Sequence, residues 1–233
     1  MADVKTSALP AAASMAATDC FVIIKDFATV PVTNRIPQTT AIPFTTTPTA
    51  DSIPLANGSG KIDINWFVDY KNLWIGGFKP TVTSACAAAA QIEMGTNKNV
   101  YDYLAFDKDS IEYAYVNVPM PLDYDGGTIT AEFYWLHPAA TAFKVSWGLQ
   151  GIAITDDGTL DVAQGTAIYS NDEGGTTSDL YISPATAAIT IGGTPAAGKL
   201  IQFRVSRKAD DATNDTLDVD AYLLGVLIKY GVA

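Results

Sequence analysis

The segment Ile201–Ser206, with the sequence Ile-Gln-Phe-Arg-Val-Ser, alternates between apolar and polar side chains. Glu132–Trp135 and Phe143–Trp147 alternate in a similar way earlier in the chain. Successive side chains of a β-strand point to opposite faces, so a period of two indicates half-buried antiparallel strands. Glycine, Asp-Gly and proline interrupt the apolar segments from Ile111 to Ala233. Turn signals at such short intervals are typical of a β-sandwich or barrel.

Working outward from these segments, we predict about eight strands in the C-terminal part of the chain. Asp125-Gly126 and Asp157-Gly158 supply turn residues that tolerate positive φ, and we expect the last strand to bend or split at Gly225. Eight short antiparallel strands around one core predict an all-β, jelly-roll-like β-sandwich over residues 99–233. The predicted strands are Glu112–Val118, Thr128–Leu136, Ala142–Ala153, Ala167–Tyr169, Asp179–Ile182, Ala187–Ile191, Lys199–Ser206 and Leu217–Tyr230.

Residues 61–98 form an aromatic-rich connecting region before this domain. We interpret its rings, Trp66 and Trp74 among them, as core or interface residues; an aromatic shelf that binds sugar is the alternative. Ala85–Met94 predicts a short helix, because it is rich in alanine and is followed by Gly95, a common helix stop.

Residues 1–60 indicate an extended N-terminal anchor region. The segment Val30–Thr33 predicts a short strand, but Pro31 cannot donate to a ladder, so this strand lies at an edge or pairs with another chain. The Thr/Pro-rich stretch Pro37–Pro54 favours an extended path that packs poorly on itself. A neighbouring subunit is the simplest support for such a path. The anchor and interface residues that we predict are Phe21, Ile23, Phe44, Trp66 and Trp74.

The net charge and the charged fraction of the chain argue against some classes of binding partner. The 233 residues carry a formal net charge of −11, and the whole excess lies in residues 101–233. This argues against nucleic acid as a partner, because neutralising phosphates needs Lys and Arg. No apolar run approaches the length of a membrane span, and we expect no signal peptide. The charged fraction of only 17% suits surfaces that are partly covered by other subunits.

Few residues in the chain suggest catalysis or a cofactor site, and we expect none of either. Cys20 and Cys86 form no metal or redox motif; buried free thiols, typical of a reducing compartment, are the favoured state and a disulfide is the alternative. The single histidine, His137, has no recognisable nucleophile to activate. Acid pairs such as Asp156-Asp157 could be calcium ligands or glycosidase carboxylates, but turn formation explains them.

The acids that follow the Ile201–Ser206 strand have a structural explanation as well. Asp215, Asp218 and Asp220 flank the start of a predicted strand. Opposite charges on neighbouring strands attract. We therefore expect these carboxylates to cap the strand or to pair with Arg204 or Arg207.

Several motifs taken in order resemble a β-sandwich domain of tailed-bacteriophage virion proteins. They are Val118–Pro121 followed by Asp125–Thr130, then Ser146–Ala153, and a closing run from Ala197 to Val226. The resemblance covers about residues 100–230. The start of the chain, from Leu9 to Thr33, is similar to a short β-module near the beginning of phage fibre and appendage proteins, although Pro31 and Pro37 interrupt its second strand.

This resemblance implies a structural protein on the virion surface, made in the host cytoplasm and commonly trimeric, with no catalytic residues. The leading hypothesis is a capsid decoration (cement) protein whose partners are its own copies and the major capsid protein or another virion protein. The alternative is a tail or head fibre whose β-domain binds a host receptor such as a surface glycan. A glycan-cleaving enzyme is the third hypothesis.

Overall fold

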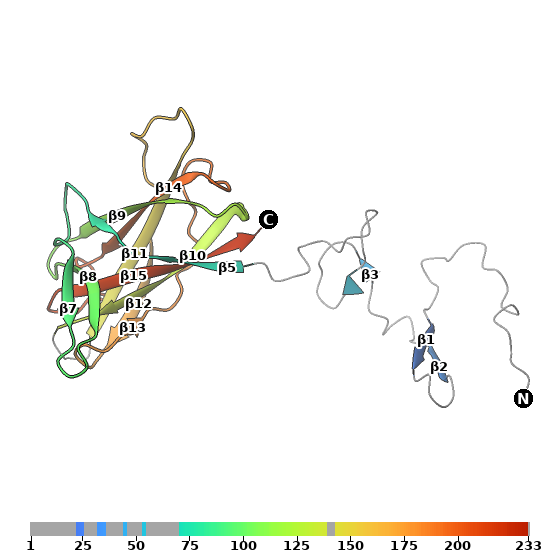
Figure 1. Ribbon diagram of the computed structural model, residues 1–233, viewed down its shortest axis with the longest axis horizontal. Coiled ribbons are helices and arrows are strands. Elements are labelled where there is room, and N and C mark those ends of the chain that lie inside the picture. The colour runs from blue at the N-terminus through green and yellow to red at the C-terminus, as the bar shows by residue number, and fades with distance from the viewer. Residues whose placement is uncertain are drawn as a thin grey trace, which may run out of the picture. The chain divides into compact units, whose positions relative to one another are not determined.

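The computed structural model describes residues 70–138 and 143–232 in full, together with the backbone of four short strands nearer the N-terminus (Figure 1). The chain divides into two compact units, Met1–Val68 and Asp69–Ala233. In the first unit β1 pairs with β2 in antiparallel fashion, and β3 pairs with β4 in parallel fashion. These strands are β1 (Val22–Lys25), β2 (Val32–Arg35), β3 (Phe44–Thr45) and β4 (Ile53–Pro54).

The second unit is a sandwich of two sheets. The first sheet has the strand order β13-β10-β15-β8-β7, with β5 also paired to β15, and the second has the order β12-β11-β14-β9-β6. The strands are β5 (Tyr70–Ile75), β6 (Lys79–Pro80), β7 (Ala90–Glu93), β8 (Val100–Phe106), β9 (Glu112–Pro119), β10 (Tyr124–Leu136), β11 (Phe143–Ile154), β12 (Ile168–Gly174), β13 (Tyr181–Ile182), β14 (Leu200–Arg207) and β15 (Ala221–Val232).

The eight strands β8 to β15 have jelly-roll connectivity. All their pairings are antiparallel, and they place β8, β15, β10 and β13 in one sheet and β9, β14, β11 and β12 in the other. Among these eight strands, only β11 and β12 are consecutive neighbours in one sheet, so from β8 to β15 the chain otherwise crosses between the sheets at each step. This order confirms the predicted fold class.

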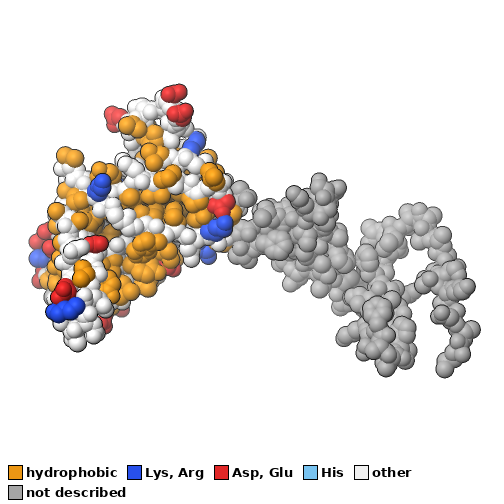
Figure 2. Space-filling view, in the orientation of Figure 1, with side chains coloured by type: hydrophobic (Ala, Val, Ile, Leu, Met, Phe, Trp, Pro, Cys, Tyr) orange, Lys and Arg blue, Asp and Glu red, His pale blue; other side chains and the backbone are white. Residues whose placement is uncertain are grey.

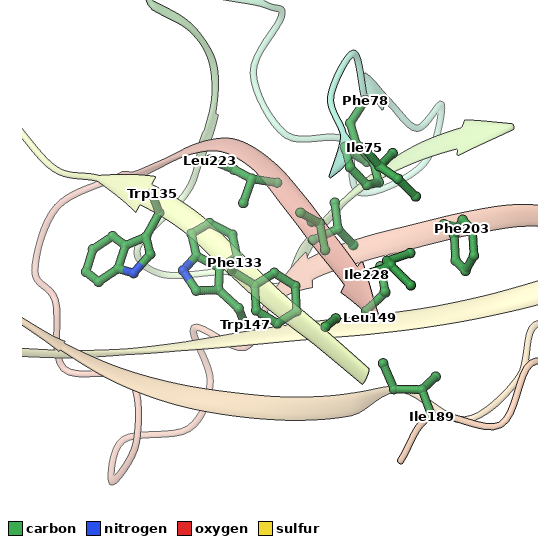
Figure 3. Packing of buried hydrophobic residues seen from close by; sticks show 14 of the residues in the cluster. Ile75, Phe78, Phe133, Trp135, Trp147, Leu149, Ile189, Phe203, Leu223 and Ile228 are labelled. Carbon is green, nitrogen blue, oxygen red and sulfur yellow. The ribbon is translucent and has the colours of Figure 1, made fainter. Parts of the chain in front are cut away.

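The alternating segments fill the space between the sheets. Phe133 and Trp135 of β10 face Val145 and Trp147 of β11, and all four side chains are fully buried. The rings of Phe133 and Trp147 stack with centroids 6.1 Å apart, and Figure 3 shows this cluster continuing toward Leu223. Both tryptophans therefore lie inside the sandwich.

A β-bulge divides β15 at the predicted position. Tyr134 pairs with Gly225, but Trp135 pairs with Leu223, so Leu224 is the extra residue on β15. Before the bulge β15 pairs with β8, and after it β15 pairs with β5. An extra residue reverses the alternation of side chains, which keeps Leu223 and Val226 both in the core.

A buried ion pair fixes the long connection between β14 and β15. Arg207 Nη2 lies 2.7 Å from Asp215 Oδ1, and both side chains are almost completely inaccessible. The guanidinium also donates to the carbonyl oxygens of Phe106 and Leu217, and the Asp215 carboxylate accepts from the backbone N–H of Ser146. The expected pairing of an acid in this region with Arg207 is thus confirmed for Asp215.

The region before residue 99 differs from our expectation. The predicted helix over Ala85–Met94 is wrong: Ala85 forms an isolated bridge with Tyr113, and Ala90–Glu93 is strand β7, paired with β8. Alanine favours helices only weakly, and pairing with the exposed edge of β8 overrides that preference. The part of the chain that is described contains no helix long and apolar enough to cross a membrane.

Two further expectations need correction. The predicted domain boundary near residue 98 lies inside the compact unit that begins at Asp69, because β5 and β7 complete the first sheet. Of the predicted strand Ala187–Ile191, only an isolated bridge between Ile189 and Ile129 is present. Strand β8, which we did not predict, lies between β15 and β7 in the first sheet.

Candidate functional site

The outer face of the first sheet is unusually rich in aromatic and aliphatic side chains. On β8, β10 and β15, the residues that alternate with the buried core residues point away from the core. We call these residues, with Trp74 of β5, the aromatic face: Trp74, Tyr101, Tyr103, Tyr134, Tyr222, Leu224 and Leu227. Hydrophobic side chains also cover much of the side of the sandwich seen in Figure 2, where charged side chains lie mostly toward the periphery.

Trp74 of the aromatic face contacts both β10 and β15. Its ring packs edge-to-face against Tyr134 of β10, with centroids 5.0 Å apart, and it lies across Gly225 at the bulge. A Cβ atom at position 225 would sit 2.4 Å from Trp74 Cζ2, so only glycine leaves room for the ring there. Trp74 nevertheless remains 50% exposed. The bulge therefore positions an indole ring that the core does not need.

A groove of about 240 Å³ opens at one end of this face. It is lined by Leu136 of β10, by Leu224, the extra residue of the bulge, and by Met94, Tyr101 and the loop Ser178–Leu180. Tyr101 and Leu180 are 43% and 55% exposed. A second depression of about 60 Å³ shares Leu224 and is lined by Asp102, Tyr103 and Phe78 among others.

The loop that forms one side of the groove is held by hydrogen bonds. The N–H of Ser178 donates to the carbonyl oxygen of His137 at 3.1 Å, and Tyr181 Oη donates to the carbonyl oxygen of Thr176 at 2.8 Å. The N–H of Gly175 donates to Tyr181 Oη at 2.9 Å. These bonds tie the loop to the ends of β10 and β13, so the groove wall is preorganised.

The polar groups of the groove are neutral or acidic. Ser178 and Asp179 line the larger depression and Asp102 the smaller one, and neither depression has Lys or Arg among its described lining residues. Asp102 Oδ1 accepts a hydrogen bond from Gln91 Nε2 at 2.8 Å. Nearby, the rings of Tyr103 and Tyr222 stack with centroids 4.2 Å apart, and burial raises the pKa of Tyr222, with the Tyr103 hydroxyl adding to the rise.

The structure places only part of the predicted anchor set. Trp74 belongs to the aromatic face, half exposed rather than in the core. Ile23 and Phe44 lie on β1 and β3, whose side chains are not described, and Phe21 and Trp66 lie outside the described residues. Sequence reasoning did not identify Tyr101, Tyr103, Tyr134 or Tyr222 as surface residues. The alternation of tyrosines 101 and 103 was the available signal for β8.

His137 and Cys86, which we considered as candidates for catalysis or redox chemistry, are both buried. His137 is buried against the rings of Phe143 and Tyr181, with centroids 4.3 and 5.5 Å away. Cys86 is a buried free thiol whose pKa burial raises to about 12, with the Glu112 carboxylate adding to the rise. Cys20 lies outside the described residues.

The acid pairs form turns in the structure. Asp157 adopts φ of 57°, and the N–H of Gly158 donates to the carbonyl oxygen of Thr155, as expected for a turn. Gly126 likewise has φ of 81°. No group of three or more potential metal-ligating side chains occurs among the described residues.

No protein-family model and no curated protein matches this chain. Solved structures with a similar fold include the Clostridium thermocellum endo-1,4-beta-D-xylanase 10B modules (12% identity, 70% of this chain and 26% of that chain, TM-score 0.38). A second is a structure of the infectious bursal disease virus Gx strain (10% identity, 69% of this chain and 31% of that chain, TM-score 0.31). A third is the bacteriophage CBA120 tailspike protein 4 enzymatically active domain (9% identity, 71% of this chain and 19% of that chain, TM-score 0.30). This chain spans less than a third of each, and the likeness is one of fold alone.

Proposed function

We propose that this protein is a non-enzymatic structural component of a bacteriophage particle, a capsid decoration protein. In this proposal it sits on the virion surface after assembly in the host cytoplasm. It forms trimers there, binds the major capsid protein or another virion protein through its N-terminal unit, and holds the shell together against internal pressure. The motif order across residues 100–230 supports the virion assignment.

The observation that carries the attachment role is the contrast between the two units. The sandwich of Asp69–Ala233 has two complete sheets around its own core. The described strands of Met1–Val68 form only two small pairs, β1–β2 and β3–β4. An isolated two-stranded pair is marginally stable in water. A strand or sheet edge from a partner would complete these pairs, which is a common way of binding extended segments.

Particles that lack the protein provide the test. Purified full-length chain is added back, and bound protein and the temperature of genome release are measured. We expect saturable binding in multiples of three copies and a higher release temperature. The proposal is wrong if the protein neither binds the particles nor raises the temperature of genome release. It is also wrong if the purified chain stays a 24.6 kDa monomer in light scattering at every concentration and also binds the particle as single copies.

The aromatic face favours a second candidate, a head or tail fibre whose sandwich binds a host receptor. Half-exposed rings such as Trp74 are common in binding surfaces. Electron microscopy of particles lacking the protein separates the two candidates. A fibre leaves particles without an appendage, whereas a decoration protein leaves particles of complete outline that break more easily.

A further inference from the structure

We propose that the groove on the aromatic face binds an uncharged carbohydrate chain. This site goes beyond particle attachment, because every residue that forms it belongs to the sandwich and none to the N-terminal unit. The proposal holds whether the protein decorates the capsid or forms an appendage.

The side chains that line the groove match the surface of a sugar ring. A pyranose presents a flat patch of C–H groups on its face and hydroxyl groups around its rim. Aromatic faces carry negative charge density that attracts such C–H groups. The groove sets Tyr101 and the aliphatic side chains of Leu136 and Leu224 beside Ser178 and Asp179. Apolar walls with a few placed polar groups are the usual composition of a small-molecule site.

The size of the groove and its continuity with a second depression favour a chain of sugars over a single small molecule. The groove, at about 240 Å³, lies below the roughly 300–1,000 Å³ of pockets that enclose a ligand. It therefore suits one unit of a longer chain that continues along the surface. Leu224 joins it to the second depression, where Asp102 and Tyr103 offer a carboxylate and a ring. Trp74, which lies across the adjacent Gly225, extends the apolar track.

The charge of the groove lining favours an uncharged ligand. The described lining contains carboxylates and no cationic side chain, and the whole chain carries a net charge of −11. Sialylated, sulfated or phosphorylated glycans would therefore be repelled. A second copy of this chain would bring the same acidic charge to the contact. The groove lining also includes Leu136 and Leu224 of the interior strands β10 and β15, whereas extended peptides bind most often to a sheet edge that offers free N–H and C=O groups.

The test uses the full-length chain and two variants of the groove. Binding to neutral oligosaccharides of glucose, galactose, mannose and xylose, and to sialylated and sulfated counterparts, is measured by calorimetry and affinity gel electrophoresis. Tyr101→Ala removes the ring, and Asp179→Asn keeps the shape but removes the charge. Tyr115→Ala is the matched control, because Tyr115 alternates with buried Ala114 on β9 and so points outward from the second sheet. Thermal melting checks that each variant is folded.

We expect at least one neutral oligosaccharide to bind, about tenfold weaker binding after Tyr101→Ala, a smaller loss after Asp179→Asn, and no change after Tyr115→Ala. Failure of every neutral probe at millimolar concentration overturns the proposal. So does binding that both groove variants leave unchanged, or a preference for the charged glycans. Concentration-dependent self-association that Tyr101→Ala abolishes would instead assign the face to contacts between copies.

Discussion

The inner and outer faces of the first sheet both carry large aromatic rings, but only the inner face buries them. Phe133 and Trp135 of β10 are fully buried, whereas Tyr134 between them is partly exposed and packs against the half-exposed Trp74. Burial of apolar area stabilises the fold by roughly 25 cal/mol per Å², so the inner rings are explained by folding alone. The outer rings bury less area and contribute less to stability, which is compatible with the binding role that we propose for them.

The largest expected effect comes from removing the strands that complete the first sheet. A chain beginning at Asp69 keeps all the strands of the sandwich and should fold cooperatively. A chain beginning at Asn99 lacks β5 and β7 and loses Ile75, Phe78 and Cys86 from the core. We expect it to aggregate or remain unfolded. Circular dichroism melting of both chains checks this, and equal melting temperatures would contradict the compact unit described above.

Truncation of an inner-face ring should be the next largest effect. Trp147 touches Phe106 and Phe133, with ring centroids 5.2 and 6.1 Å away, and is fully buried. Trp147→Ala should lower the free energy of unfolding by roughly 3–5 kcal/mol, because it leaves a large cavity between the sheets. Urea denaturation measures the change. A loss below about 1 kcal/mol would mean that the ring is not in the core.

The buried ion pair predicts a slightly smaller loss. Arg207→Met leaves the Asp215 carboxylate in a buried site without its cation, which should cost about 3 kcal/mol. Lys108→Met is the matched control, since it breaks the exposed Lys108–Asp218 pair, whose attraction is weakened by solvent. If the two variants lose equal stability in urea denaturation, the Arg207 network does not fix the β14–β15 connection.

Much of the sandwich could be predicted from the sequence, and the errors have physical causes. Every second side chain of segments such as Ile201–Ser206 and Phe143–Trp147 is buried in the core. The resulting period of two in hydrophobicity identifies these segments as strands. Strand β7 was missed because Ala90 and its neighbours have little apolar periodicity and gain their structure from pairing with β8. The groove depends on contacts between residues far apart in the chain, from Met94 to Leu224. Gly225 was the only signal in the sequence for the bulge that places Leu224 in the groove.

The core thiol predicts a modest alkaline effect. In the folded protein burial raises the pKa of Cys86 to about 12, so above its unfolded pKa, about 8.5, the unfolded chain binds fewer protons. The contribution of Cys86 to the free energy of unfolding should then be fully present below about pH 8.5, the unfolded pKa, and should fall as the pH rises toward 12. Cys86→Ala should make this decline shallower. Tyr124, whose pKa burial also raises to about 12, contributes the same sign in both proteins and is unchanged by the substitution.

The smallest effect on stability should come from the outer face itself. Trp74→Ala removes a half-exposed ring that contacts Tyr134 and Gly225, so the transfer term is small and water fills the space. We expect a loss of less than about 1.5 kcal/mol, well under that of Trp147→Ala, with carbohydrate or particle binding reduced more than stability. Urea denaturation and binding are measured on the same preparation. If Trp74→Ala destabilises the fold as much as Trp147→Ala, both faces serve folding, and the argument that the outer rings are kept for binding fails.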